Sequence, residues 1–204
     1  MKILAFDTSS SALSAAIFDG KKKLGLHESH LNLRHSETLA VTLQKLLKTG
    51  KIKPKNIDCV AVGLGPGSFS GLRIGVTTAK ILSYALKAKL VGISSLEAMA
   101  RSAERDGDFA VTVDAKKSQV YAAVYRRKNG RWRALQKPHL AVKDIFLKSL
   151  ESDVEILDGV SAKAVSIVDA ARERVRDKKL DDPFTLTPLY LHPKDCNVHK
   201  KSKK

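Results

Sequence analysis

Two stretches of the chain repeat one another without a gap. The segment FDTSSSALSAAIF begins at Phe6, and VDAKKSQVYAAVY begins 107 residues later at Val113, so that Asp7 aligns with Asp114. Small and apolar residues recur at matching places after each aspartate. Because the repeat spans about half of the 204 residues, it predicts two lobes of one architecture, whereas a solenoid requires at least three shorter units.

The first half is predicted to open with strands and to continue with alternating helices and strands. Apolar runs before residue 30 indicate three antiparallel strands, with a turn at Asp19-Gly20 before the third. Apolar spacing then predicts helices over 36–49, 70–88 and 95–105. The buried runs NIDCVAVGLG and KLVGIS are the strands between them.

The second half is predicted to be a slimmer copy of the first. After its first two strands it has a hairpin turn at Asn129-Gly130, a helix from about residue 143, the strand VEILDG and the long helix SAKAVSIVDAARERVR. We therefore expect a first lobe over 1–105, a smaller second lobe over 106–190 and a basic tail over 191–204.

The segment GPGSFSGLRIG, residues 65–75, joins a predicted buried strand to a predicted helix. Backbone amides at a helix N-terminus suit an anion, but the Gly-Lys-Ser/Thr ending of a P-loop is missing. We interpret the segment as a structural elbow, because Gly71, Gly75 and Ala79 lie four residues apart and let another backbone come close. Arg73 is interpreted either as a contact to an anion or a partner carboxylate, or as a solvated side chain. The residues assigned to this glycine loop are Gly65, Pro66, Gly67, Ser68, Gly71 and Arg73.

The charge balance is strongly basic. Lys and Arg number 37 against 21 acidic residues, which gives a net charge of +16 and a pI of about 9.9. Such an excess is typical of a protein that binds nucleic acid or an acidic protein, and a solvated basic surface is the plain alternative. The two cysteines fit neither a disulfide framework nor zinc spacing, and no run approaches the ~18 apolar residues of a membrane span. We therefore expect a cytoplasmic protein without a membrane segment.

The two lobes resemble those of the actin-like ATPase superfamily (ASKHA, ribonuclease H-like fold). This is an α/β fold in which each lobe has a mixed sheet, opened by an antiparallel β meander and flanked by helices. More closely, the chain resembles the TsaB (YeaZ) family in the order and spacing of the motifs ILAFDTSS, RHSETL, GLGPGSFSGLRIG, GISSLEAMA, VDAKKSQVY and PLYLHP. The resemblance implies a partner subunit in the bacterial complex that places threonylcarbamoyl on adenosine next to the anticodon of certain tRNAs.

Asp7, Thr8, Ser9 and Asp114 are interpreted as vestigial phosphate turns. In actin-like kinases such turns face a nucleotide and bind a cation and phosphate; in the alternative reading Asp7 accepts backbone N–H groups of its own turn. Ala115-Lys116-Lys117 stands where a glycine-rich turn would let a phosphate approach the backbone. We therefore expect no intrinsic cofactor and no ATP hydrolysis by the chain alone, with ATP bound only at the level of a complex.

The resemblance also implies that no metal is bound. The TsaD relative of this family carries two metal-binding histidines four residues apart on the helix after KLVGIS, and that spacing lets both converge on one ion. Ser95 and Met99 stand at those positions here, and a hydroxyl with a thioether does not hold a hard cation. His35 and Glu37 invite a catalytic pairing, yet the sequence shows no nucleophile on a glycine elbow. We therefore expect no catalytic residue.

The resemblance implies that the helices over 36–49 and 70–88 form a four-helix bundle with a TsaD-type catalytic subunit, or with a second copy as a homodimer. The candidate interface residues are Leu39, Leu43, Leu46, Gly71, Ile74, Gly75, Thr78 and Ile81. A TsaE-type small ATPase is a further implied subunit.

The basic surface is expected to hold tRNA, mostly through phosphates. The candidates for this contact are Lys116, Lys117, Arg126, Arg127, Lys128, Arg131, Arg133 and the terminal lysines. Two other functions are weighed against the scaffold. One is a stand-alone actin-like ATPase or phosphotransferase, and the other is a pure RNA-binding module, for which the chain has no RRM, KH or zinc-knuckle signature.

Overall fold

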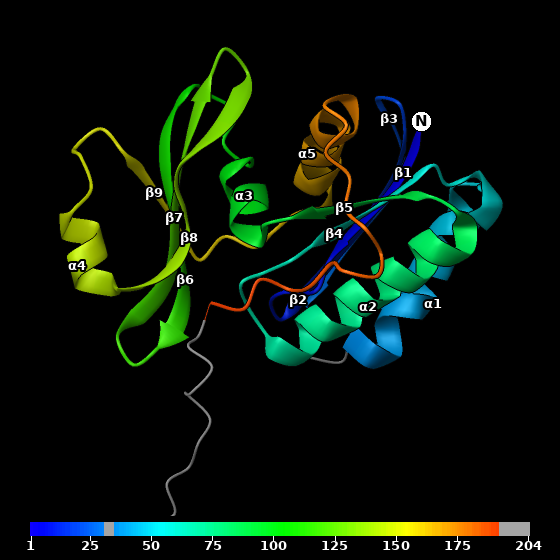
Figure 1. Ribbon diagram of the computed structural model, residues 1–204, viewed down its shortest axis with the longest axis horizontal. Helices are drawn as coiled ribbons and strands as arrows, with labels where there is room; N and C mark the ends of the chain where they lie inside the picture. Colours follow the sequence, from blue (N-terminus) through cyan, green and yellow to red (C-terminus); the bar gives the residue numbers. More distant parts are fainter. Residues whose placement is uncertain (31–34, 192–204) are drawn as a thin grey trace, which may run out of the picture.

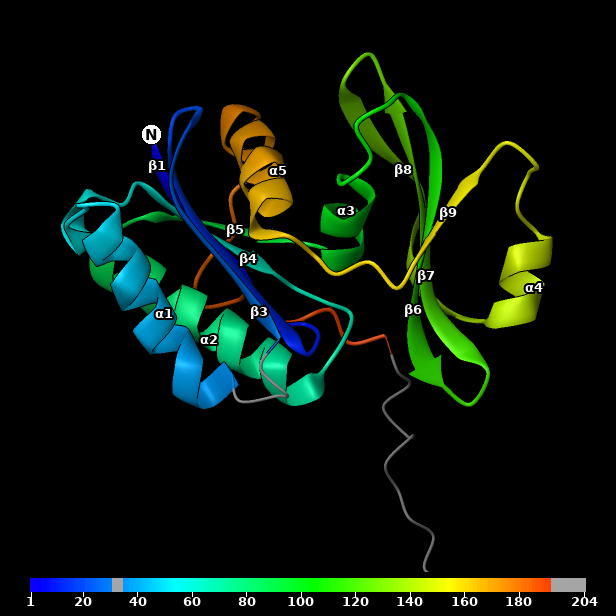
Figure 2. The same cartoon turned by 180° about the vertical axis from the view of Figure 1, so that it is seen from behind.

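The computed structural model describes residues 1–30 and 35–191 and contains two β-sheets with helices packed against them (Figures 1 and 2). The strand order is β3-β2-β1-β4-β5 in the first sheet and β8-β7-β6-β9 in the second. The strands of the first sheet are β1 (Lys2–Asp7), β2 (Ala12–Asp19), β3 (Lys22–His30), β4 (Cys59–Gly63) and β5 (Lys89–Ile93). The strands of the second sheet are β6 (Gly107–Lys116), β7 (Gln119–Lys128), β8 (Arg131–Val142) and β9 (Glu155–Asp158).

Both sheets are built on the same plan. β1, β2 and β3 form an antiparallel meander, and β4 adds to β1 in parallel; β6, β7 and β8 form the second meander, and β9 adds to β6 in parallel. The prediction of a two-lobed α/β fold with mixed sheets is confirmed.

Helices cover both faces of the first sheet. α1 (His35–Thr49) and α2 (Phe69–Leu86) lie on one face, and α5 (Ala164–Arg176) lies on the other (Figure 1). α3 (Ser95–Ala100) lies between the two sheets, and α4 (Lys143–Lys148) packs on the outer face of the second. A 3-10 helix, η1 (Pro54–Asn56), precedes β4. None of the helices in the described residues is long and apolar enough to cross a membrane.

The lobe boundaries expected from the sequence need correction after residue 163. α5 packs against β1, β2, β4 and β5, which are strands of the first sheet. Residues 177–191, named the strap here, then follow the edge of that sheet and the outside of α2. Residues 164–191 therefore belong structurally to the first lobe, because the buried side of α5 covers the sheet face that α1 and α2 leave open. Most of the expected tail, residues 192–204, lies outside the described residues.

The two lobes share one apolar core. Ile3 and Val91 from the first sheet, Val111 from the second and Ile167 from α5 belong to a single buried cluster. A second cluster under α1 and α2 includes Phe6, which is fully buried. The lobes are thus joined by close packing through α3 and α5 as well as by the chain.

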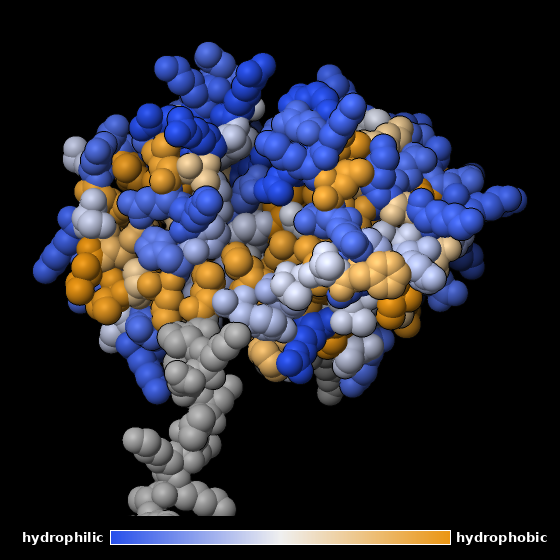
Figure 3. Space-filling model, viewed as in Figure 1, coloured by the Kyte–Doolittle hydropathy of each residue, from blue (hydrophilic) through white to orange (hydrophobic). Residues whose placement is uncertain are grey.

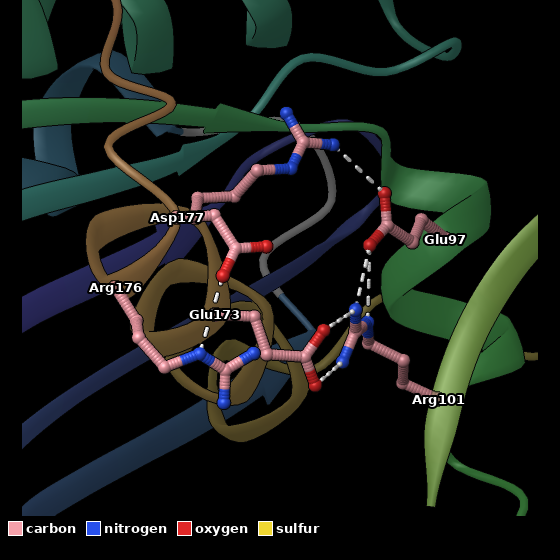
Figure 4. Close-up of polar contacts among 6 residues, drawn as sticks. Glu97, Arg101, Glu173, Arg176 and Asp177 are labelled. Atoms are coloured by element: carbon pink, nitrogen blue, oxygen red, sulfur yellow. Dashed lines mark hydrogen bonds and ion pairs between the residues drawn. The ribbon is translucent and has the colours of Figure 1, made fainter.

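Ion pairs reinforce the contact between α3 and α5 (Figure 4). The Arg101 guanidinium donates to both carboxylate oxygens of Glu173, at 3.0 and 2.8 Å, and to Glu97 at 3.1 and 2.9 Å. Arg174 donates to the other oxygen of Glu97 at 3.2 Å. The Arg101 side chain is only 6% exposed, so this bidentate geometry fixes α3, and the second sheet packed on it, against the first lobe.

Candidate functional site

The carboxylate of Asp7 is buried at the end of β1, beneath the turn that leads to β2, and the residue is 1% exposed. Oδ1 accepts the Ser9 N–H at 2.8 Å and the Ser9 hydroxyl at 2.6 Å, while Oδ2 accepts the Ser95 hydroxyl at 2.6 Å. Burial raises the pKa of Asp7 above its ordinary value, and the bonds from the two serines oppose that shift. Asp7 is therefore held by its own turn and by the start of α3.

The glycine loop packs directly on this turn. Ser68 N–H donates to the carbonyl oxygen of Ser9 at 2.7 Å. A Cβ on Gly67 would lie 2.0 Å from the same oxygen, which is closer than real contacts allow. The backbone that approaches this glycine is thus the protein's own β1–β2 turn.

The first turns of α2 continue the contact. The Thr8 hydroxyl donates to the carbonyl of Gly71 at 2.7 Å. A Cβ on Gly71 would lie 2.1 Å from the Thr8 carbonyl oxygen, and one on Gly75 would lie 2.3 Å from the Thr8 hydroxyl oxygen. The four-residue spacing of these glycines therefore serves the contact of α2 with the β1–β2 turn.

The far side of Asp7 is closed as well. A Cβ on Gly63, at the end of β4, would lie 1.8 Å from Asp7 Oδ2. Ser95 Oγ accepts the Gly65 N–H at 3.0 Å, and the Ser95 N–H donates to the Gly65 carbonyl at 2.8 Å. Strand β4, the glycine loop and α3 thus meet around one carboxylate, with its hydrogen bonds supplied from within the chain.

The corresponding turn of the second lobe is open. The Asp114 side chain is 65% exposed and accepts the Lys116 N–H at 2.9 Å and the Lys116 ammonium at 3.0 Å. These two bonds lower the pKa of Asp114. Lys116, Lys117 and Ser118 all have positive φ, at 69°, 52° and 59°. No hydrogen bond or ion pair connects Asp114 with Asp7 in the part of the chain that the structure describes.

Ser95 and Met99, which stand where the resemblance places metal ligands, have other contacts. The Ser95 hydroxyl bonds Asp7, and Met99 is 2% exposed within the shared core. His35 is buried with its Nε2 2.7 Å from the Ser10 carbonyl, while Glu37 is exposed, so the two do not form a pair. Within residues 1–30 and 35–191, no three His, Cys, Asp or Glu side chains gather in a way that would hold a metal ion.

The interface residues expected on the two helices need correction. Leu39, Leu43 and Leu46 are at most 6% exposed because they cover the first sheet. Gly71 and Gly75 are buried against Thr8. These five residues hold the lobe together and are not available to a partner. The remaining three are the half-buried Ile74 and Thr78 and the exposed Ile81.

Ile81 belongs to a larger set of exposed side chains on the outside of α2 and on the strap. We name it the α2–strap surface, and its members are Phe69, Ile81, Tyr84, Phe184 and Tyr190, which are between 47% and 74% exposed. The Phe69 and Tyr190 rings lie 5.4 Å apart between centroids, and Tyr84 and Phe184 lie 5.5 Å apart, edge to face. The aromatic side chains are thus ordered in pairs, each with one member from α2 and one from the strap.

The strap is anchored beneath these rings. Leu186 is buried in the core under α2, and the Lys80 ammonium donates to its carbonyl at 3.1 Å. Leu189 N–H donates to the Leu64 carbonyl at 2.8 Å, next to the glycine loop. This element was not predicted from the sequence, although the apolar spacing in FTLTPLYL is a usable signal for it.

Arg73 belongs to the same surface. Its guanidinium lies 4.0 Å from the centroid of the Phe69 ring, and its Nε donates to the Tyr190 hydroxyl at 3.4 Å. The side chain therefore stacks on the exposed aromatic pair and points away from the buried turn.

Several cations expected to contact tRNA are paired within the second lobe. Arg126 forms a two-point ion pair with Asp108, at 2.6 and 2.5 Å, and lowers the pKa of that carboxyl. Lys116 pairs with Asp114, as described above. Arg127 lies 3.8 Å from the carboxylate of Asp106. The terminal lysines lie outside the described residues.

Comparison with known proteins agrees with this architecture. A family model described as TsaD, tRNA N6-adenosine threonylcarbamoyltransferase, matches residues 17–166. The tRNA threonylcarbamoyladenosine biosynthesis proteins TsaB of Bacillus subtilis and Escherichia coli are 35% and 34% identical over 131 and 139 residues. These alignments cover 64% and 65% of this chain and 57% and 58% of the relatives, so the chain spans less than two thirds of their length. The solved structure of YeaZ from Pseudomonas aeruginosa superposes with a TM-score of 0.83 at 21% identity, over 93% of this chain and 99% of that one.

Fold and site together define a class: a two-lobed α/β protein with two mixed sheets of one plan, in which the turn after β1 is closed by the chain's own serines and glycine loop. The chain belongs to the threonylcarbamoyltransferase family of the matching model, within its TsaB (YeaZ) branch.

Proposed function

We propose that this chain is a non-catalytic scaffold subunit in the formation of N6-threonylcarbamoyladenosine in tRNA, and that it binds a TsaD-type catalytic subunit through the α2–strap surface. The observation that carries the proposal is the gathering of five large exposed apolar side chains on one helix and the strap beside it. Exposed aromatic groups of this kind are the usual anchors of protein interfaces.

The contacts of Asp7 favour a scaffold over a stand-alone ATPase or phosphotransferase. Both carboxylate oxygens are occupied by Ser9 and Ser95, and the glycine loop lies within hydrogen-bonding distance of the turn. A nucleotide phosphate would have to displace these contacts. We accordingly propose no intrinsic nucleotide, and a requirement for ATP, with a TsaE-type small ATPase, at the level of the complex.

The partner surface is expected to carry acidic side chains around an apolar centre. Arg73 and Lys80 lie on α2, and neither has an ion pair in the described part of the chain. In a homodimer built on a two-fold axis the same patch faces itself, which would bring these cations together. An acidic partner removes that repulsion, so we favour the heterodimer over the homodimer.

The surface also offers a hollow for a partner side chain. A pocket of about 580 Å³ lies beside Tyr84 and is lined by Leu90, Leu180 and Pro183 among others. It adjoins the Tyr84–Phe184 pair, where an inserted apolar group would be surrounded by aromatic and aliphatic carbon.

The test is light scattering after size exclusion, on the chain alone and mixed with the TsaD-type subunit from the same genome. We expect a heterodimer that Ile81→Arg weakens by at least about 30-fold, because the new charge would be buried at the interface. Ile145→Arg is the matched control, since Ile145 on α4 is 68% exposed and Ile81 is 61% exposed.

Three results would contradict the proposal. Equal loss of the complex in both variants would show a general effect of the added charge, and an unchanged complex in Ile81→Arg and Tyr84→Arg would place the interface elsewhere. Absence of any complex with the wild-type chain would argue against the partner itself. Saturable ATP turnover by the isolated chain would favour the alternative function.

A further inference from the structure

We infer that the end of the first sheet opposite to the Asp7 turn is a binding surface for the phosphate backbone of RNA. Nine lysines crowd this end, which we name the lysine end; they are residues 21–23, 48, 51, 53, 55, 87 and 89. Lys21 lies in the turn between β2 and β3, and Lys22 and Lys23 begin β3. The connection between α1 and β4, which includes η1, contributes Lys51, Lys53 and Lys55; all six lysines are exposed. The inference rests on the proposed function only for the identity of the RNA as tRNA.

The sheet register brings these lysines to one end of the lobe. Lys2, Asp19 and Lys22 are partners across β1, β2 and β3. The Asp58 N–H donates to the Lys2 carbonyl at 2.9 Å, and the Lys89 N–H donates to the Asp58 carbonyl at 3.0 Å. All five strands therefore have an end here, in both views of the fold (Figures 1 and 2).

The helices add further lysines to the same end. Lys48 lies in the last turn of α1, Lys87 caps α2, and Lys89 begins β5. The end of α1 packs against the start of β3: a Cβ on Gly50, the residue after α1, would lie 3.5 Å from Leu24 Cβ. Figure 3 shows hydrophilic side chains projecting from this part of the molecule, at the right of the view.

The carboxylates at this end have other partners. Asp181, which lines the pocket beside Lys87 and Lys89, accepts the Gly92 N–H at 2.8 Å. Asp19 is paired with the N-terminal amino group at 3.3 Å and with Lys2 at 3.4 Å. Asp58 accepts the Lys2 N–H at 2.6 Å. None of the nine lysines that make up the lysine end, at 21–23, 48, 51, 53, 55, 87 and 89, has an ion pair within residues 1–30 and 35–191.

Helix dipoles account for only part of this pattern. A cation is favourable at the C-terminal end of a helix, which suits Lys48 and Lys87. The other seven lysines lie on turns, loops and a strand end, where neighbouring like charges repel within a Debye length of about 8–10 Å. A polyanion relieves that repulsion and releases its own counterions on binding.

The chemistry of the surface favours RNA over a protein partner. Lysine is depleted at protein interfaces, whereas nucleic-acid interfaces are rich in positive charge. A lysine ammonium contacts a phosphate as a point charge and reads no base pattern, so binding should be insensitive to sequence and steeply dependent on salt.

The lysine end also borders the proposed docking surface. Lys87 and Lys89 line the same 580 Å³ pocket as Tyr84 and Pro183. RNA bound along the lysines would therefore lie beside a subunit bound to the α2–strap surface. This placement gives the scaffold a second task, which is to hold the RNA next to its partner.

The test is fluorescence anisotropy of a labelled tRNA transcript, titrated with the chain alone over a range of salt concentrations. The variant is Lys22→Gln, Lys23→Gln, Lys53→Gln and Lys55→Gln combined. The matched control is Arg105→Gln, Lys137→Gln, Lys148→Gln and Lys163→Gln combined, which removes the same charge from exposed positions outside both the lysine end and the basic residues listed from the sequence. Circular dichroism checks that both variants are folded.

We expect the lysine-end variant to bind at least about tenfold more weakly at constant salt, with a slope of log K against log salt smaller by roughly four, and the control to change little. Equal weakening in both variants would assign binding to net charge alone and overturn the inference. The same holds if the lysine-end variant binds as well as the wild type, or if the wild-type chain does not bind the transcript.

Two further measurements distinguish RNA binding from membrane binding and from docking of the TsaD-type subunit. Vesicles of phosphatidylcholine and phosphatidylserine test an anionic membrane as the ligand. If the lysine-end variant loses binding to the vesicles and still binds RNA as the wild type does, the RNA assignment is overturned. Light scattering of the lysine-end variant with the TsaD-type subunit should still show the complex. Failure of docking and failure of RNA binding are thus observed independently.

Discussion

Asp7 and Asp114 hold the same place in the two copies of the repeat, yet their surroundings are opposite. Asp7 is 1% exposed and accepts three hydrogen bonds from serines, whereas the Asp114 side chain is 65% exposed and pairs with the residue two positions along. Burial raises the pKa of Asp7, and the bonds from Lys116 lower the pKa of Asp114. Position in a repeat therefore does not fix the environment of a side chain.

The difference arises from the segment after the parallel strand of each lobe. In the first lobe β4 runs into the glycine loop, whose Gly67 and Gly71 allow the backbone to close over the turn. In the second lobe β9 ends at Asp158, which accepts the Thr112 hydroxyl at 2.9 Å and pairs with Lys143 at 3.1 Å. Glycine at a few positions thus decides whether a turn of this fold becomes a packed joint or stays open.

The largest expected effect comes from adding one methyl group at the closed joint. Gly71→Ala places a Cβ against the Thr8 carbonyl, at 2.1 Å in the present geometry, so the helix and the turn must separate. We expect a loss of about 3 kcal/mol in the free energy of unfolding, measured by urea denaturation followed by circular dichroism.

The matched control lies in the second lobe. Gly159 follows β9 as the glycine loop follows β4, has φ of +71° and has no atom within 4 Å of an added Cβ. Gly159→Ala should cost only the backbone strain of a positive φ, about 1 kcal/mol. Equal losses at the two sites would remove the distinction between a closed and an open turn.

A smaller loss is expected when the buried carboxylate itself is removed. Asp7→Ala leaves the Ser9 N–H, the Ser9 hydroxyl and the Ser95 hydroxyl without their acceptor, and a buried unpaired donor costs about 1–3 kcal/mol. Relief of the desolvated charge offsets part of that cost, so we expect a net loss of about 2 kcal/mol by urea denaturation.

Asp114→Ala is the comparison for this change. Its carboxylate is exposed, so the stability should stay close to that of the wild-type chain. A destabilisation as large as that of Asp7→Ala would mean that the second turn is as tightly constrained as the first. The same outcome would also undermine the assignment of Asp7 as the centre of the joint.

The sequence predicts the architecture well because the repeat and the strand patterns are local signals. The spacing of glycines also indicates a close contact, but the contacting backbone, at Thr8 and Ser9, is distant in sequence. The register of the β6–β7 hairpin also differs from that of the β1–β2 hairpin. Asp7 pairs with Ser14, whereas Asp114 pairs with Val120, because a bulge follows Asp114 in β6. An ungapped alignment cannot show such a shift.

The candidate interface was harder to predict. Apolar spacing on α1 shows that Leu39 and Leu43 share a face, but an amphipathic pattern does not say whether that face meets a sheet or a partner. The answer depended on the strap, which returns from beyond residue 176 and supplies half of the exposed aromatic pairs. Contacts between segments so far apart leave no periodic signal.

The smallest expected effect, and the most direct comparison of the two turns, is in the pH dependence of stability. A raised pKa in the folded state means that the folded chain holds the Asp7 proton to higher pH than the unfolded chain. The free energy of unfolding then falls as the pH rises from the ordinary aspartate range, near 4, through the folded pKa. Asp7→Asn lacks this fall, so its stability relative to the wild type should increase with pH in that interval.

The contribution of Asp114 to the free energy of unfolding changes with pH in the opposite direction. Its lowered pKa contributes stability above pH 4 that is lost as the pH falls through the folded value. The wild type therefore gains stability as the pH rises toward 4. Asp114→Asn lacks this gain, so its stability relative to the wild type should decrease over the same interval. Urea midpoints of both variants between pH 3 and 7 measure the two slopes. If both slopes have the sign expected for Asp114, the pKa of Asp7 is lowered as well. The effect of its hydrogen bonds on the pKa would then be larger than the effect of its burial.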